Sequence, residues 1–165
     1  MTVTDELLKN AEAYAASFDK ADLSMPPAKQ IAIVACMDAR LNPYGLLGLS
    51  EGDAHVIRNA GGVVTQDELR SLAISPRLLG TKEIVLIHHI DCGMLTFTDQ
   101  QFRDDIAADT GVRPSWASEA FTDLEADVRQ SIARIHVETS IPVKDSVRGF
   151  VYDVSTGQLN EVKAA

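Results

Sequence analysis

The sequence has little positive charge and few aromatic side chains. Fifteen lysines and arginines stand against 24 aspartates and glutamates, which gives a formal net charge of −9, and aromatic residues make up 5% of the chain. Nucleic acids and anionic membrane surfaces are bound through positive charge. The charge balance therefore argues against both as partners, and we expect neither a nucleic acid nor a membrane.

The sequence also lacks long apolar runs and has only two cysteines. No stretch approaches the ~18–20 residues of a membrane-spanning helix. Residues 1–14, MTVTDELLKNAEAY, are acidic and polar, without the basic flank and apolar centre of a secretory signal. We therefore expect a cytoplasmic protein. In that compartment two cysteines more often bind a metal or act in catalysis than form a disulfide.

The remaining composition is that of one globular domain. Hydrophobic residues make up 45% of the 165 residues and charged residues 24%, which is ordinary for a globular protein of this length. We expect a single domain over 1–165, in which residues 1–28 form a helical arm and a connector. Apolar side chains recur at helical spacing over residues 4–18, and a Pro-Pro pair follows in the connector. Because the helix is terminal, it can pack on its own domain or on a partner subunit.

Short apolar segments alternate with helical ones through the rest of the chain. Strands are predicted at 31–35, 54–58, 83–88 and 148–154, an edge strand at 158–162, and longer helices at 65–79, 98–109 and 118–136. Such alternation indicates an α/β fold with right-handed crossovers. We expect a mainly parallel four-stranded sheet of order 2-1-3-4 flanked by helices, with an additional C-terminal edge strand. This order opens a crevice at the carboxyl ends of the first and third strands.

Chemically capable side chains follow those two strands. Cys36, Asp38 and Arg40 come after the run IAIVA, and His89 and Cys92 come after the run EIVLIH. Two thiolates and one imidazole are three ligands of a tetrahedral zinc site, and no third cysteine is present to close it. The fourth position would then be left for water. Asp38 can hold that water in a hydrogen bond while Arg40 keeps Asp38 ionised. We therefore predict one catalytic zinc ion per chain.

The order and spacing of these motifs resemble the β-class carbonic anhydrases, in the small branch typified by bacterial and archaeal members. The matching segments are CMDAR at 36–40, RNAGG at 58–62 and HIDCG at 89–93. The resemblance implies reversible hydration of carbon dioxide to bicarbonate and a proton by attack of a zinc-bound hydroxide. It also implies a homodimer or tetramer with the N-terminal helix packed across the dimer, and a counterpart of Asp38 that can swing onto the metal.

The segment Asn59, Ala60, Gly61 and Gly62 follows the second predicted strand at the same edge of the sheet. We expect it to form a wall of the substrate pocket. The two glycines fit a tight backbone path better than phosphate binding, since no phosphate-binding pattern is present.

Other interpretations of the same residues stay open. A carbonyl sulfide or carbon disulfide hydrolase would use the same zinc site on an analogous linear molecule. A non-catalytic zinc-binding or redox-sensing thiol protein would explain the cysteines but not the pair of Asp38 and Arg40, which could also be an ordinary surface ion pair. His88 fits core packing better than a proton relay, and Asp91 fits a turn better than catalysis.

Overall fold

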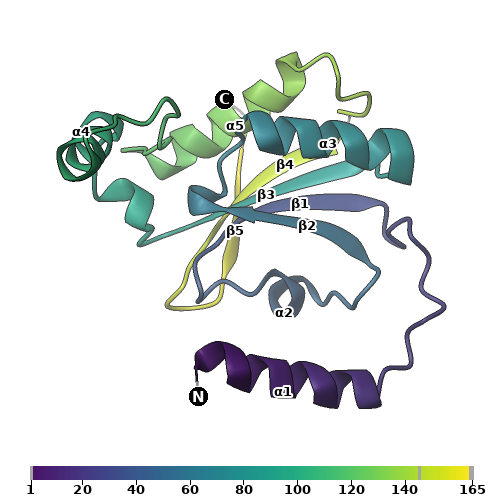
Figure 1. Cartoon of the computed structure of the whole chain (residues 1–165). Helices are drawn as coiled ribbons and strands as arrows, with labels where there is room; N and C mark the ends of the chain where they lie inside the picture. The colour runs from purple at the N-terminus through teal and green to yellow at the C-terminus, as the bar shows by residue number, and fades with distance from the viewer. Residues whose placement is uncertain (1, 145, 164–165) are drawn as a thin grey trace.

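The computed structural model describes residues 2–144 and 146–163 (Figure 1). Four residues of the expected 1–165 domain lie outside the described residues: Met1, Asp145, Ala164 and Ala165. The extent of the domain therefore stays a prediction. The described chain contains helices α1 (Val3–Ala16), α2 (Pro43–Leu47), α3 (Gln66–Leu79), α4 (Asp99–Thr110) and α5 (Leu124–Val137), and strands β1 (Ile31–Cys36), β2 (Ala54–Asn59), β3 (Glu83–His89), β4 (Ser146–Tyr152) and β5 (Leu159–Val162).

The five strands form one sheet of order β2-β1-β3-β4-β5. β1 pairs in parallel with β2 and with β3, β3 pairs in parallel with β4, and β5 runs antiparallel to β4. This confirms the predicted mainly parallel sheet with its C-terminal edge strand. Because the chain leaves β1 toward β2 on one side and later places β3 on the other, a crevice opens at the carboxyl ends of β1 and β3.

Both faces of β1 are buried, which explains its uninterrupted run of apolar residues. Ala32 and Val34 pack with Leu72 of α3 and Ile135 of α5 on one face. On the other face, Ile33 belongs to a second cluster, against which partly buried leucines of α2 pack. Figure 1 shows α3 and α5 on one side of the sheet and α2 on the opposite side.

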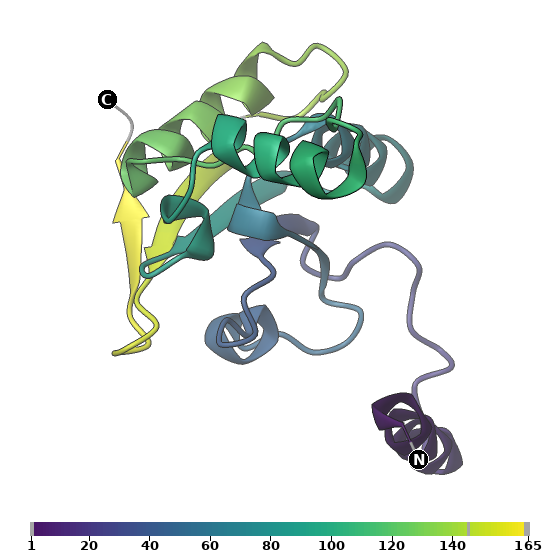
Figure 2. The ribbon, with the colours of Figure 1, turned by 60° about the vertical axis from the view of Figure 1, so that its left-hand side comes forward.

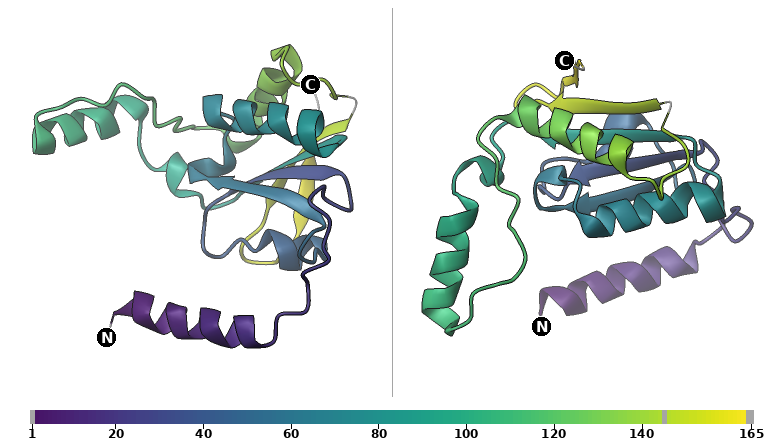
Figure 3. Two further views of the ribbon diagram at one scale, coloured as in Figure 1. Left: turned by 45° about the vertical axis from the view of Figure 1, so that its right-hand side comes forward. Right: turned by 90° about the horizontal axis from the view of Figure 1, so that it is seen from above.

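Two helices stand apart from these layers. Figure 2 shows α1 away from the sheet, and Figure 3 shows both α1 and α4 projecting from it. Neither helix has a buried residue. A hydrogen bond from Tyr14 Oη to Glu51 Oε1 of 2.5 Å and the Lys20–Glu51 ion pair connect the α1 region to the rest of the chain. No helix in the described part is long and apolar enough to cross a membrane. The cytoplasmic location stays a prediction.

The predicted helix over 118–136 is wrong at its start. α5 begins at Leu124, because the Asp123 carboxylate accepts the Ala126 backbone N–H at 2.9 Å and so caps the helix there. Before the cap, Glu119 has a φ of +59°, which helical backbone excludes. The residues before α5 therefore run as an irregular segment.

Candidate metal centre

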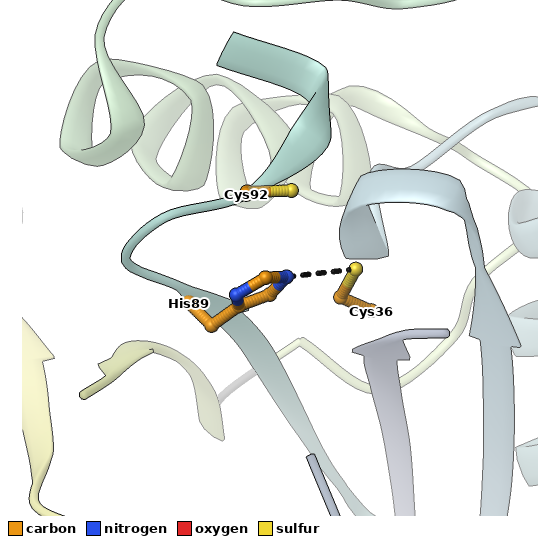
Figure 4. A group of neighbouring side chains, drawn as sticks. All are labelled: Cys36, His89 and Cys92. Atoms are coloured by element: carbon orange, nitrogen blue, oxygen red, sulfur yellow. Dashed lines mark hydrogen bonds between the residues drawn. The ribbon is translucent and has the colours of Figure 1, made fainter. Parts of the chain in front are cut away.

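Three buried side chains meet at the carboxyl ends of β1 and β3. Cys36 is the last residue of β1, His89 is the last residue of β3, and Cys92 follows in the turn after β3. One ligand atom of each residue lies within 4.8 Å of the other two, and Figure 4 shows the three side chains facing a common point. The parallel pairing of β1 with β3 brings together residues that are 53 positions apart in sequence.

The imidazole of His89 has a fixed orientation. Its Nδ1 lies 2.8 Å from the carbonyl oxygen of Ile90, which can only accept, so Nδ1 carries the proton. The lone pair of Nε2 then faces Cys36, whose Sγ lies 3.2 Å away. A carbonyl that holds the far nitrogen is the usual support of a metal-binding histidine.

The site favours negative charge on one of its two sulfur atoms. A hydrogen bond from Cys92 lowers the pKa of the Cys36 thiol to about 4 despite the opposing effect of burial, and a hydrogen bond with His89 contributes to the same shift. The interaction with Cys36, together with burial, raises the pKa of Cys92. A thiolate is the form of cysteine that binds a metal, and a cation between the two sulfurs would favour that form of both.

Asp38 lies beside this cluster and is held by Arg40. The guanidinium donates from Nε to Oδ1 at 3.0 Å and from Nη2 to Oδ2 at 2.8 Å, and the backbone N–H of Arg40 donates to Oδ1 at 2.8 Å. These bonds hold the pKa of Asp38 well below its usual range. Oδ2 of Asp38 lies 3.6 Å from Nε2 of His89, so an ionised carboxylate stands next to the three candidate ligands.

Arg40 also joins the two loops of the site. Its Nη1 donates to Oδ2 of Asp91 at 2.8 Å and its Nη2 to the Asp91 carbonyl at 3.1 Å. Asp91 does adopt a turn conformation, with a φ of +56°, but its carboxylate bonds to Arg40. The loop after β1 and the loop after β3 are therefore connected through one guanidinium.

Arg58 is a residue that the sequence analysis did not single out. Its guanidinium donates hydrogen bonds to the carbonyl oxygens of Cys36, Asp38 and Leu41. The available signal was its place in the RNAGG segment, at the end of the strand that pairs with β1. Sequence alone gives no reason for a strand-end arginine to turn toward a neighbouring loop.

A pocket of about 420 Å³ adjoins the metal cluster. Its wall includes the apolar side chains of Met37, Ala60, Met94 and Phe97 together with Gly61. A neighbouring pocket of about 360 Å³ shares Ala60, Met94 and Phe97 and has Asn59 in its wall.

Gly62 lies behind the pocket wall, against the backbone. Its φ is +71°, and an added Cβ would lie 2.8 Å from the Cys36 nitrogen and 2.9 Å from the Ile87 carbonyl oxygen. Asn59 donates from Nδ2 to the Val63 carbonyl at 2.8 Å. Of the four predicted wall residues, Ala60 and Gly61 thus line the pocket beside the metal cluster. Asn59 lines the neighbouring pocket, and Gly62 fits the tight backbone path.

His88 points toward α5. Its side chain is fully buried, its Nε2 lies 2.7 Å from Oδ2 of Asp127, and its ring centroid lies 5.6 Å from that of Phe121. This placement fits the packing role.

Comparisons with known proteins agree on one family. The family model described as carbonic anhydrase matches residues 31–159. Over 98% of this chain and 99% of the relative, the sequence is 61% identical to β-carbonic anhydrase 1 of Mycobacterium bovis. It is 34% identical to a carbon disulfide hydrolase of Saccharolobus solfataricus, over 95% of this chain and 87% of that protein. The crystal structure of carbonic anhydrase from Streptococcus mutans matches with a TM-score of 0.92 at 43% identity, covering 99% of both chains.

Proposed function

This chain belongs to the β-carbonic anhydrase family, and we propose that it hydrates carbon dioxide reversibly at one zinc ion per chain, held by Cys36, His89 and Cys92. The observation that supports the proposal is the convergence of two thiols and one oriented imidazole within 4.8 Å, beside a largely apolar pocket. The products would be bicarbonate and a proton.

The donor set fits a catalytic zinc ion. Zinc–sulfur bonds of about 2.3 Å and zinc–nitrogen bonds of about 2.05 Å place tetrahedral ligand atoms about 3.6–3.8 Å apart. The distance between His89 Nε2 and Cys36 Sγ is 3.2 Å, and no pair among the three ligand atoms exceeds 4.8 Å. Small side-chain adjustments reach the tetrahedral spacing. Three protein ligands are typical of catalytic zinc sites, which keep the fourth position for the reaction.

The chain's own residues would orient and protect the reaction. A bound zinc ion supplies a Lewis acid that makes water a good nucleophile near neutral pH. Asp38, kept ionised by Arg40, would accept a hydrogen bond from the attacking water and so would orient it. Ala60, Met94 and Phe97 present apolar surface, which suits a non-polar linear substrate.

Arg40 would also keep the Asp38 carboxylate away from the metal. A carboxylate oxygen 3.6 Å from His89 Nε2 is near enough to compete for the metal if it is released. Three hydrogen bonds from Arg40 oppose that movement. We infer that Asp38→Ala keeps its zinc but loses maximal rate, because the attacking water loses its acceptor.

The test is stopped-flow hydration of carbon dioxide across pH, with zinc measured on the same sample. We expect one zinc per chain and activity that rises with pH. Cys92→Ser should lose zinc and activity together. Thr96→Ala, which changes another residue of the pocket wall, serves as a matched control that keeps its zinc. Full zinc occupancy in Cys92→Ser would remove Cys92 from the ligand set, and zinc binding without hydration at any pH would favour the non-catalytic thiol protein.

A second candidate is hydrolysis of carbonyl sulfide or carbon disulfide, favoured by the 34% identity to a carbon disulfide hydrolase. The two activities would share the metal ligands and differ in the pocket wall. Turnover of carbon dioxide, carbonyl sulfide and carbon disulfide should be compared on one zinc-loaded sample. The larger kcat/KM identifies the substrate.

The working unit in our proposal is a homodimer or a tetramer. Five large apolar side chains lie at least half exposed on α1 or just after it: Val3, Leu7, Leu8, Tyr14 and Phe18. A second copy of the chain would cover them, as apolar patches of this kind mark interaction sites. Light scattering should find a dimer or a larger assembly at micromolar concentration. A fully active monomer would refute this part of the proposal.

A further inference from the structure

Arg58 binds the backbone of the loop after β1 at three places. Its Nε donates to the Cys36 carbonyl at 3.0 Å, and its Nη2 lies 2.7 Å from the Cys36 carbonyl and 2.8 Å from those of Asp38 and Leu41. Three carbonyl oxygens from residues 36–41 therefore converge on one guanidinium. The same six residues carry Cys36, Asp38 and Arg40 of the proposed site.

The convergence needs a cation with several donors. Three carbonyl dipoles that point at one place repel each other unless positive charge lies between them. A guanidinium supplies that charge and donors in a rigid plane, whereas the ammonium group of lysine is a compact point charge without this fork. Arg58 also reaches the loop from β2, outside both β1 and β3. It therefore ties the loop to a third strand.

The other contacts hold the loop at single points, and none of them gathers its carbonyl oxygens as Arg58 does. Beyond the end of β1, the Met37 N–H donates to the Asn59 carbonyl at 2.8 Å, and the Leu41 N–H donates to the Asp38 carbonyl at 3.0 Å within the loop itself. The position of Asp38 is sensitive, because its carboxylate must reach the attacking water while it stays paired with Arg40. A displacement of about 1 Å from such a geometry is enough to cost on the order of 100-fold in rate.

We propose that Arg58 is a positioning residue for the hydration reaction, which sets the place of Cys36 and Asp38 by holding the backbone of residues 36–41. The inference rests on the proposed function for its kinetic readout. Arg58 is not among the residues that line the pocket beside the cluster, so it acts through the loop and does not touch the substrate.

The test compares Arg58→Ala and Arg58→Lys with Arg70→Ala. Arg70 is an exposed arginine whose Nε donates to Asp67 at 2.8 Å on the surface of α3, away from the site. Arg58 is itself exposed, so its truncation leaves no sealed cavity. We expect Arg58→Ala to lose about 10–100-fold in kcat, the range seen when outer supports of a metal site are removed. KM and zinc content should stay near wild type, and Arg70→Ala should be unchanged.

Chemical rescue separates positioning from a general structural role. Guanidinium ion, added to Arg58→Ala well below denaturing concentrations, should restore part of kcat, and the same addition should leave wild type and Arg70→Ala unchanged. Arg58→Lys should stay at least tenfold slow, because lysine keeps the charge but not the planar fork. A kcat within twofold of wild type in either Arg58 variant would overturn the inference. If Arg58→Ala fails to fold or to bind zinc, Arg58→Lys decides alone.

A second readout does not depend on turnover. In the cobalt-substituted protein, the visible absorption bands report the geometry around the metal. We expect Arg58→Ala to change these bands and guanidinium to reverse the change. If wild type binds metal without hydrating carbon dioxide, the proposed function fails, and the spectra still test Arg58. Bands identical to wild type in Arg58→Ala and Arg58→Lys would overturn the positioning role.

Discussion

Gly62→Ala tests how tightly the two metal-bearing strands are packed. An added Cβ at Gly62 would lie 2.8 Å from the Cys36 nitrogen, 2.9 Å from the Ile87 carbonyl oxygen and 3.1 Å from the Ala35 carbonyl carbon. All three atoms belong to the backbone of β1 or β3, so no flexible side chain can move aside. The substitution must therefore move backbone, either the Ala60–Gly62 turn or the strands that deliver Cys36 and His89.

The expected cost has two parts. A φ of +71° disfavours any residue with a Cβ, and the left-handed conformation costs roughly 1–2 kcal/mol. Overpacking of a rigid core adds about 1–3 kcal/mol. The sum, about 2–5 kcal/mol, is a large part of the 5–15 kcal/mol that is usual for the unfolding free energy of a domain.

Gly80→Ala is the matched control. Gly80 follows the last residue of α3 with a φ of +72°, and an added Cβ there meets nothing within 4 Å. This variant carries the conformational cost alone. Urea unfolding of both variants, at one protein concentration and one zinc concentration, should separate them by about 1–3 kcal/mol. Equal losses in the two variants would refute the steric argument, and unchanged hydration by Gly62→Ala would show that the strand ends are not displaced.

Three further predictions concern buried pairing, pH and the metal. Asp127→Ala leaves Nε2 of fully buried His88 without its partner. Urea unfolding should show that the unfolding free energy falls by about 1–3 kcal/mol and that Asp127→Asn recovers much of this loss. An unfolding midpoint equal to that of wild type would contradict this prediction. A hydrogen bond from the backbone N–H of Ser118 lowers the pKa of Asp99 below its usual 3.8. Because the pKa is lower in the folded than in the unfolded chain, the stabilisation by ionised Asp99 is complete above about pH 4 and is lost as the pH falls further. In wild type, the protection of backbone amides around α4 against hydrogen exchange should fall below that pH. Asp99→Asn should lack this pH dependence. Removal of zinc by a chelator should lower the unfolding free energy. The loss should be about 2.7 kcal/mol when the reference sample contains free zinc at one hundred times its dissociation constant, and added zinc should restore it. Identical melting of apo and zinc-loaded protein would show that zinc does not bind the folded chain.

The sequence predicted the fold well because its signals are local. An uninterrupted apolar run is what a strand buried on both faces requires, and Ile31–Cys36 is such a strand. Helix α3 was predicted at 65–79 and lies at Gln66–Leu79, with the Thr65 backbone N–H donating to Glu68 at its start. The start of α5 was missed because the apolar spacing continues before Asp123, and spacing alone does not show where the backbone turns.

The set of candidate metal ligands also followed from the sequence. Cys36, His89 and Cys92 each come at or just after a strand end, and parallel pairing brings such ends to one edge of the sheet. The fold class and the residue types were therefore enough to predict that these three side chains meet.

Only the tertiary structure decided how the site is supported. Arg40 reaches Asp91 across 51 residues, Arg58 reaches the Cys36 carbonyl across 22, and His88 meets Asp127 across 39. Such contacts depend on the direction of single side chains after the elements have packed, which no periodicity records. The sequence by itself determined which groups stand at strand ends, because local apolar patterns show where each buried strand stops. Packing decided which arginine holds which loop, because that depends on distances between segments far apart in the chain.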